Sequence, residues 1–157
     1  MKKFVLVLLM CFPLTTICQK SLISYDDIKY LLHNNINEAD TFLAAKGYFT
    51  IKKDNNTKNR KYSLKFHGGT QNVISLRYDG KRLFIELETN DINQYDVIRE
   101  SISQYLIKDG MAADIQTYQV KDLGNIYIMV NDTMPYDPLK RDYDIQIVGD
   151  KHITAYN

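Results

Sequence analysis

The sequence predicts an α+β protein: a two-layer sandwich in which an antiparallel sheet of about seven strands carries two amphipathic helices on one face. Two observations support this fold class. Several short segments alternate apolar and polar residues, as strands with one buried face do. Two longer segments instead repeat apolar residues at spacings of three and four, which is typical of a helix with one apolar stripe. Their order along the chain is one helix, four strands, a second helix and three strands.

The first helix is expected to begin after Ser24, a residue suited to the N-cap, with Asp26 and Asp27 in its first turn. Its apolar stripe continues in phase across Asn34–Asn35, so the sequence predicts one uninterrupted helix. Gly47 is a natural residue to end it.

Four alternating segments follow and predict an antiparallel meander, with strands at 48–52, 62–66, 72–78 and 83–87. The polar segment 52–61 is expected to be a loop. Asp79–Gly80 is a dipeptide typical of a type I′ hairpin turn between the third and fourth strands.

The second half is predicted to repeat this plan. A helix begins at the N-cap Asp91 and ends at Asp109–Gly110, and strands follow at 115–120, 126–130 and 143–148. Each half is therefore a helix followed by a meander, which suggests an old duplication of an α-then-β unit.

The N-terminus has the pattern of a signal peptide over residues 1–18, followed by a single domain at 19–157. Lys2 and Lys3 precede an apolar run from residue 4 to residue 14, which is too short to span a membrane. We therefore expect an exported protein of a bacterial envelope, periplasmic or secreted.

Cys18 leaves two interpretations open. Cleavage after Cys18 would release a soluble domain, whereas a lipid attached to its thiol would anchor the protein to a membrane. Ile17 stands where a lipoprotein signal normally has a small residue, so simple cleavage is the favoured interpretation.

Composition excludes several classes of function. The two cysteines, Cys11 and Cys18, both fall within the predicted signal, so the mature domain would hold no disulfide and no cysteine nucleophile. Loss of Lys2 and Lys3 changes the net charge from +1 to −1, which argues against nucleic acid as a partner.

No catalytic motif is recognisable, and the histidines His33, His67 and His152 lack the spacing of metal ligands. Neither a cofactor nor a metal is expected. Glu86 and Glu88 alternate with apolar neighbours, and a solvated strand face is favoured over an acid–base pair.

The sequence favours a non-enzymatic binding protein whose partner is another protein of the envelope. It has twelve tyrosines and no tryptophan, and tyrosine is enriched at interfaces. A possible interaction surface is formed by four tyrosines of the second half: Tyr118, Tyr127, Tyr136 and Tyr143. Tyr118 and Tyr127 fall on adjacent predicted strands, where they could share a face.

Two alternatives remain. The first is a carrier of a small molecule or lipid, with its pocket between the helices and the sheet. The second is a hydrolase with a dispersed site, for which His67 and Glu86 are the best candidates.

Overall fold

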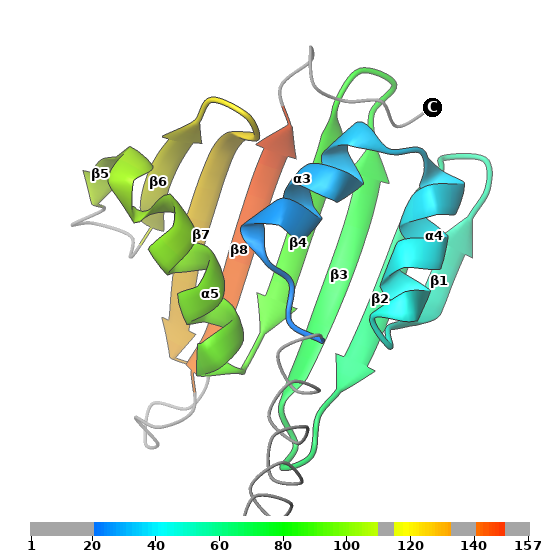
Figure 1. The fold of residues 1–157 in the computed structure, drawn as a ribbon, viewed down its shortest axis with the longest axis horizontal. Helices are drawn as coiled ribbons and strands as arrows, with labels where there is room; N and C mark the ends of the chain where they lie inside the picture. Colours follow the sequence, from blue (N-terminus) through cyan, green and yellow to red (C-terminus); the bar gives the residue numbers. More distant parts are fainter. Residues whose placement is uncertain (1–20, 110–114, 133–140, 150–157) are drawn as a thin grey trace, which may run out of the picture.

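The computed structural model describes residues 21–109, 115–132 and 141–149. In this part of the chain, one antiparallel sheet of eight strands is combined with three α-helices (Figure 1). The predicted α+β class is confirmed, with one more strand and one more helix than the sequence pattern indicated. The predicted signal peptide at 1–18 lies outside the described residues.

The sheet has the strand order β1-β2-β3-β4-β8-β7-β6-β5, and every neighbouring pair is antiparallel. Each half of the chain contributes a meander of four strands. The halves join through their last strands, so β4 lies beside β8 and not beside β5. The bounds are β1 (Phe49–Asp54), β2 (Asn59–Lys65), β3 (Gln71–Tyr78), β4 (Leu83–Thr89), β5 (Leu106–Asp109), β6 (Ile115–Val120), β7 (Gly124–Asp132) and β8 (Arg141–Gly149).

The prediction of one long first helix is wrong. The helix is interrupted at Asn35, which separates α3 (Tyr25–His33) from α4 (Ile36–Ala45). Asn35 has an extended backbone, with φ −76° and ψ 171°. Its side-chain oxygen accepts hydrogen bonds from the backbone N–H groups of Asn37 and Glu38. Asn35 therefore acts as a new N-cap, which the apolar stripe alone did not reveal.

The second helix, α5 (Ile92–Ile102), is shorter than predicted. A 3₁₀ turn at Ser103–Tyr105 leads into β5, which the sequence analysis missed. β5 pairs with β6, where Leu106 lies opposite Tyr118. β5 has only four residues, and Leu106 continues the apolar spacing of α5, so the local pattern did not distinguish this strand from the end of the helix.

The turn at Asp79–Gly80 is not of type I′. A type I′ turn needs positive φ at both central residues. In this loop only Gly80 has a positive φ, of 89°. The carboxylate of Asp79 accepts hydrogen bonds from the N–H groups of Lys81 and Arg82, which lowers the pKa of that carboxyl. The predicted loop at 52–61 also shortens, because β1 runs to Asp54 and β2 begins at Asn59.

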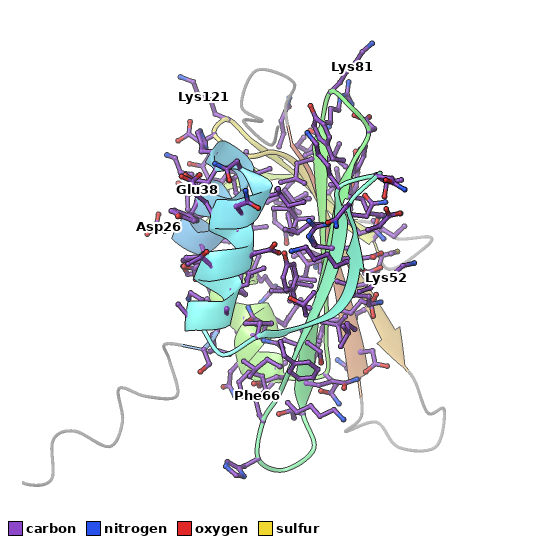
Figure 2. All side chains as sticks on the ribbon, turned by 90° about the vertical axis from the view of Figure 1, so that its right-hand side faces the viewer. Asp26, Glu38, Lys52, Phe66, Lys81 and Lys121 are labelled. Carbon is purple, nitrogen blue, oxygen red and sulfur yellow. The ribbon has the colours of Figure 1, made fainter. Side chains whose placement is uncertain are left out.

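All three helices lie on one side of the sheet (Figures 1 and 2). Between them and the sheet is a single cluster of buried residues that draws on every helix and on most strands. Leu31 of α3, Leu43 of α4 and Ile98 of α5 are fully buried there, as are Leu76 and Ile145 of the sheet. Burial of this apolar area is the main stabilising contribution to the fold.

A polar network lies within this core. The side-chain amide of Gln94, fully buried on α5, accepts a hydrogen bond from the N–H of Ile23 (2.7 Å) and donates one to its carbonyl oxygen (2.8 Å). Asn72 of β3 donates to the Gln94 oxygen (2.9 Å) and to the Tyr48 hydroxyl (3.0 Å). Burial raises the pKa of that hydroxyl, although the bond from Asn72 opposes the shift. The network fixes the segment before α3 to both layers.

Candidate functional site

The sheet face turned away from the helices is covered by no helix or strand among the described residues (Figure 2). Strand side chains alternate between faces, so the residues between those of the buried apolar cluster point to this side. We call this surface the open face. Its residues are Lys52 (β1), Lys61, Ser63 and Lys65 (β2), Val73, Ser75 and Arg77 (β3), Phe84, Glu86 and Glu88 (β4), Asp142, Asp144, Gln146 and Val148 (β8), and Tyr127 and Met129 (β7).

The register places Glu86 and Glu88 on the open face, as their alternation with apolar neighbours predicted. Glu86 lies opposite Ser75 and Gln146, and Glu88 lies opposite Val73 and Asp144. Both glutamates therefore project away from the buried cluster.

One end of the open face contains an apolar groove of about 430 Å³, which spans β3, β4, β8 and β7. Phe84 and Val148 are directly opposite each other in the register, and Tyr127 lines the groove from the next strand. Arg77 lies at its margin, with its guanidinium 4.0 Å from the Glu86 carboxylate. The lining also includes the polar residues Asn59, Asp79 and Gln146. Aromatic and aliphatic groups bordered by polar residues and an arginine are a composition typical of protein-binding anchors.

A second groove of about 300 Å³ lies further along β4 and β8, and we call it the acidic groove. Its walls include Val73 and the carboxylates of Glu88, Asp142 and Asp144. The Asp144 Oδ2 atom accepts a hydrogen bond from Gln146 (2.9 Å), but its Oδ1 atom is buried and has no donor within the described part of the chain.

The pKa of Asp144 is raised. Partial burial is the main cause and the charge of Glu88 adds to it, whereas the bond from Gln146 and the charge of Arg77 oppose it. Glu88 has its own counter-ion, since the Lys61 Nζ atom lies 3.5 Å from its carboxylate. The ionised form of Asp144 is thus poorly compensated, and a donor supplied by a bound partner would stabilise it.

The structure does not bring the four predicted tyrosines together. Tyr118 and Tyr143 are 2% and 6% exposed and lie on the core face, where Tyr143 stacks on Tyr95 at 4.2 Å between ring centroids. Tyr127 lies on the open face, and Tyr136 is outside the described residues.

The expectation that Tyr118 and Tyr127 share a face is wrong. In the register of β6 and β7, Tyr118 lies opposite Ile126, whereas Tyr127 lies opposite Thr117. A shift of one residue in pairing reverses the face on which a side chain lies, and the turn that sets this pairing could not be read from the sequence.

The hydrolase candidates are also separated. His67 is exposed in the β2–β3 turn, beyond the pair Lys65–Gln71, while Glu86 lies opposite Ser75, four residues further along β3. Four residues of strand span about 13 Å. His33 is exposed on α3, where its ring nitrogen Nδ1 lies 2.8 Å from the Lys29 carbonyl oxygen, and His152 is outside the described residues.

Phe84, Val148 and Asp144 were not among the site residues predicted from the sequence. The sequence did contain a signal for a surface site. Phe84 and Val148 are apolar, although the alternation of their strands assigns both positions to the outer face of the sheet. Their approach across β4 and β8 was not readable, since these strands are far apart in the chain.

Comparisons with protein-family models, with curated proteins and with solved structures find no significant match. In the described residues, no group of three or more histidine, cysteine, aspartate or glutamate side chains could hold a metal ion. No helix in the described ranges is long and apolar enough to cross a membrane.

Proposed function

We propose that this chain is an exported, non-enzymatic binding protein of the bacterial envelope that docks another protein on its open face. The observation that carries the proposal is the apolar groove of Phe84, Tyr127 and Val148 on a sheet face that no described helix covers. Large apolar side chains on a strand face are normally buried, so their grouping on an uncovered face favours a binding surface.

The dimensions of the open face suit a protein partner. The residues of the open face come from six neighbouring strands, which at a spacing of about 4.8 Å are about 24 Å wide, and six residues of strand are about 20 Å long. The resulting flat area of about 480 Å² is more than half of the roughly 800 Å² that each partner buries in a standard interface. A small ligand would use only a part of such a surface.

Export is proposed from the sequence alone. The pattern of residues 1–18 is typical of a signal peptide, and the domain that would follow has no cysteine. Whether the mature protein is soluble or anchored depends on the fate of Cys18. The apolar and acidic grooves both open away from the helices, so neither supplies the pocket between helices and sheet that a carrier would need.

The proposal is tested by changing the apolar groove in the full chain. In a gentle extract of the producing cells, we expect the tagged protein to elute at a size larger than that of two copies of the chain. The double variant Phe84→Asp with Val148→Asp should elute at a smaller size, because two carboxylates would have to be desolvated in the interface.

A matched control places the same chemical change on the helix layer. Tyr30→Asp with Ile92→Asp alters two residues that are 39% and 50% exposed on α3 and α5, and it should leave the complex intact. If the groove variant is folded by circular dichroism and still elutes with the larger complex, the open face is not the docking surface.

A further inference from the structure

Apart from Asp54 at the end of β1, whose carboxylate accepts hydrogen bonds from the N–H groups of Asn56 and Thr57 in the next turn, the charged residues of the open face are divided by sign along the boundary between β3 and β4. One side, the basic strip, consists of Lys52, Lys61, Lys65 and Arg77 on β1, β2 and β3. The other side, the acidic strip, consists of Glu86, Glu88, Asp142 and Asp144 on β4 and β8. Lys52 can be located in Figure 2, on the side of the sheet away from the helices.

The strips remain accessible although they exchange ion pairs across their boundary. Lys61 pairs with Glu88 at 3.5 Å, and the side chains are 37% and 47% exposed. Arg77, 58% exposed, is 4.0 Å from Glu86. Exposed pairs of this kind contribute only about 0–1 kcal/mol, so they can be exchanged for contacts with another surface at small cost.

This pattern is self-complementary. Two copies whose open faces oppose each other can be related by a rotation of 180°. The rotation axis runs between the two sheets, parallel to the strands and over the β3–β4 boundary. This rotation carries each strip to the opposite side of the boundary. The basic strip of one copy then faces the acidic strip of the other, and the converse contact forms at the same time. Val73 on β3 and Phe84 on β4 lie on the two strands beside the axis, which places apolar side chains near the centre of such an interface.

We propose that two copies of this chain associate face to face through their open faces, with the basic strip of each on the acidic strip of the other. The axis over the β3–β4 boundary places β1, β2 and β3 of each copy against β4, β8 and β7 of the other. Each copy then buries about 480 Å², which is in the range of small, weak interfaces. The dimer occupies the same face as the proposed protein partner, so the two complexes exclude each other. The inference stands without that partner, because it depends only on the chain's own charges.

The test uses protein recovered after expression of the full chain, two charge-reversal variants and sedimentation at several concentrations. Variant one, Lys61→Glu with Lys65→Glu, makes the basic strip more acidic. Variant two, Glu86→Lys with Glu88→Lys, makes the acidic strip more basic. The control variant, Lys81→Glu with Lys121→Glu, changes two exposed lysines in turns at the end of the sheet (Figure 2).

We expect the unchanged protein and the control variant to dimerise, and each strip variant alone to sediment as a monomer. An equimolar mixture of the two strip variants should form a one-to-one heterodimer, since the unchanged acidic strip of variant one then faces the unchanged basic strip of variant two, and the new glutamates face the new lysines. High salt should weaken every dimer. Circular dichroism would verify that each variant is folded.

The proposal is overturned if the unchanged protein is monomeric at all concentrations, or if the strip variants dimerise alone as well as the unchanged protein does. It is also overturned if the mixture remains monomeric. A monomeric result would leave docking of a different protein untouched, because that proposal is tested separately through Phe84 and Val148.

Discussion

Asp144 lies on β8 directly opposite Glu88, and its Oδ1 atom is buried with no donor among the described residues. Its pKa is raised, mainly through partial burial. A carboxyl whose pKa is higher in the folded state than in the unfolded state destabilises the fold once it ionises. The destabilisation is absent below the unfolded pKa of about 3.9, develops as the pH rises through the folded pKa, and is complete above it.

We therefore expect Asp144→Asn to stabilise the protein near neutral pH by a few tenths of a kcal/mol, because Asp144 is partly exposed to solvent. The amide oxygen can still accept the hydrogen bond from Gln146. Urea unfolding of both proteins near pH 7 and below about pH 4 checks this, and the difference should vanish at the lower pH. If Asp144→Asn is instead less stable than the unchanged protein near pH 7, the carboxylate of Asp144 is well compensated in the folded protein.

At the scale of the elements, the break between α3 and α4 allows a contact that a continuous helix would forbid. The Lys46 Nζ atom lies 2.6 Å from the Asp27 carboxylate, and both side chains are largely buried. In one straight helix these residues, nineteen apart, would be separated by about 28 Å. The two helices therefore fold back on each other, and Asn35 makes this possible.

Asn35→Ala should reduce the free energy of unfolding by about 1 kcal/mol, because the N–H groups of Asn37 and Glu38 would lose their acceptor. Asn37→Ala is the matched control, since it removes an exposed side chain inside the same helix and should change stability by less than about 0.5 kcal/mol. Thermal unfolding compares the two. Equal effects would mean that the cap at Asn35 contributes nothing specific.

The network around Gln94 connects α5, β3 and the segment before α3. Gln94→Leu should cost about 2–3 kcal/mol, because the amide of Asn72 and both backbone groups of Ile23 would remain buried without that partner. Hydrogen exchange at the Ile23 N–H should also accelerate.

Gln119→Leu is the control for this change, because it makes the same chemical replacement at an exposed position of β6. Chemical denaturation measures both variants. If the two have the same stability, the buried network does not hold the layers together.

At the scale of the whole molecule, the sequence was informative where structure is determined locally. Alternation located seven of the eight strands, and Gly47, with φ 91°, follows the C-cap of α4 as predicted. Features that depend on distant residues were not readable. The pairing of β4 with β8 leaves no local pattern, because these strands are remote in the chain, and the four residues of β5 are too few to show strand alternation.

The same limit applied to the candidate site. Tyrosine composition directed attention to Tyr118 and Tyr143, which the register places in the core. The apolar groove is instead formed by Phe84 and Val148. These residues lie opposite each other because β4 and β8 pair where the two halves of the chain join. Only the register of the assembled sheet could separate core tyrosines from surface ones.

The most direct measurement of the central claim, that the open face is a docking surface, is photo-crosslinking in the producing cell. The reactive residue p-benzoylphenylalanine replaces Phe84 in the apolar groove or, as a control, Ile92, which is 50% exposed at the start of α5. We expect a discrete adduct from position 84 and none from position 92. The mass of the adduct distinguishes a second copy of the chain from a different protein. Adducts from position 92 alone, or from neither position, would contradict the account.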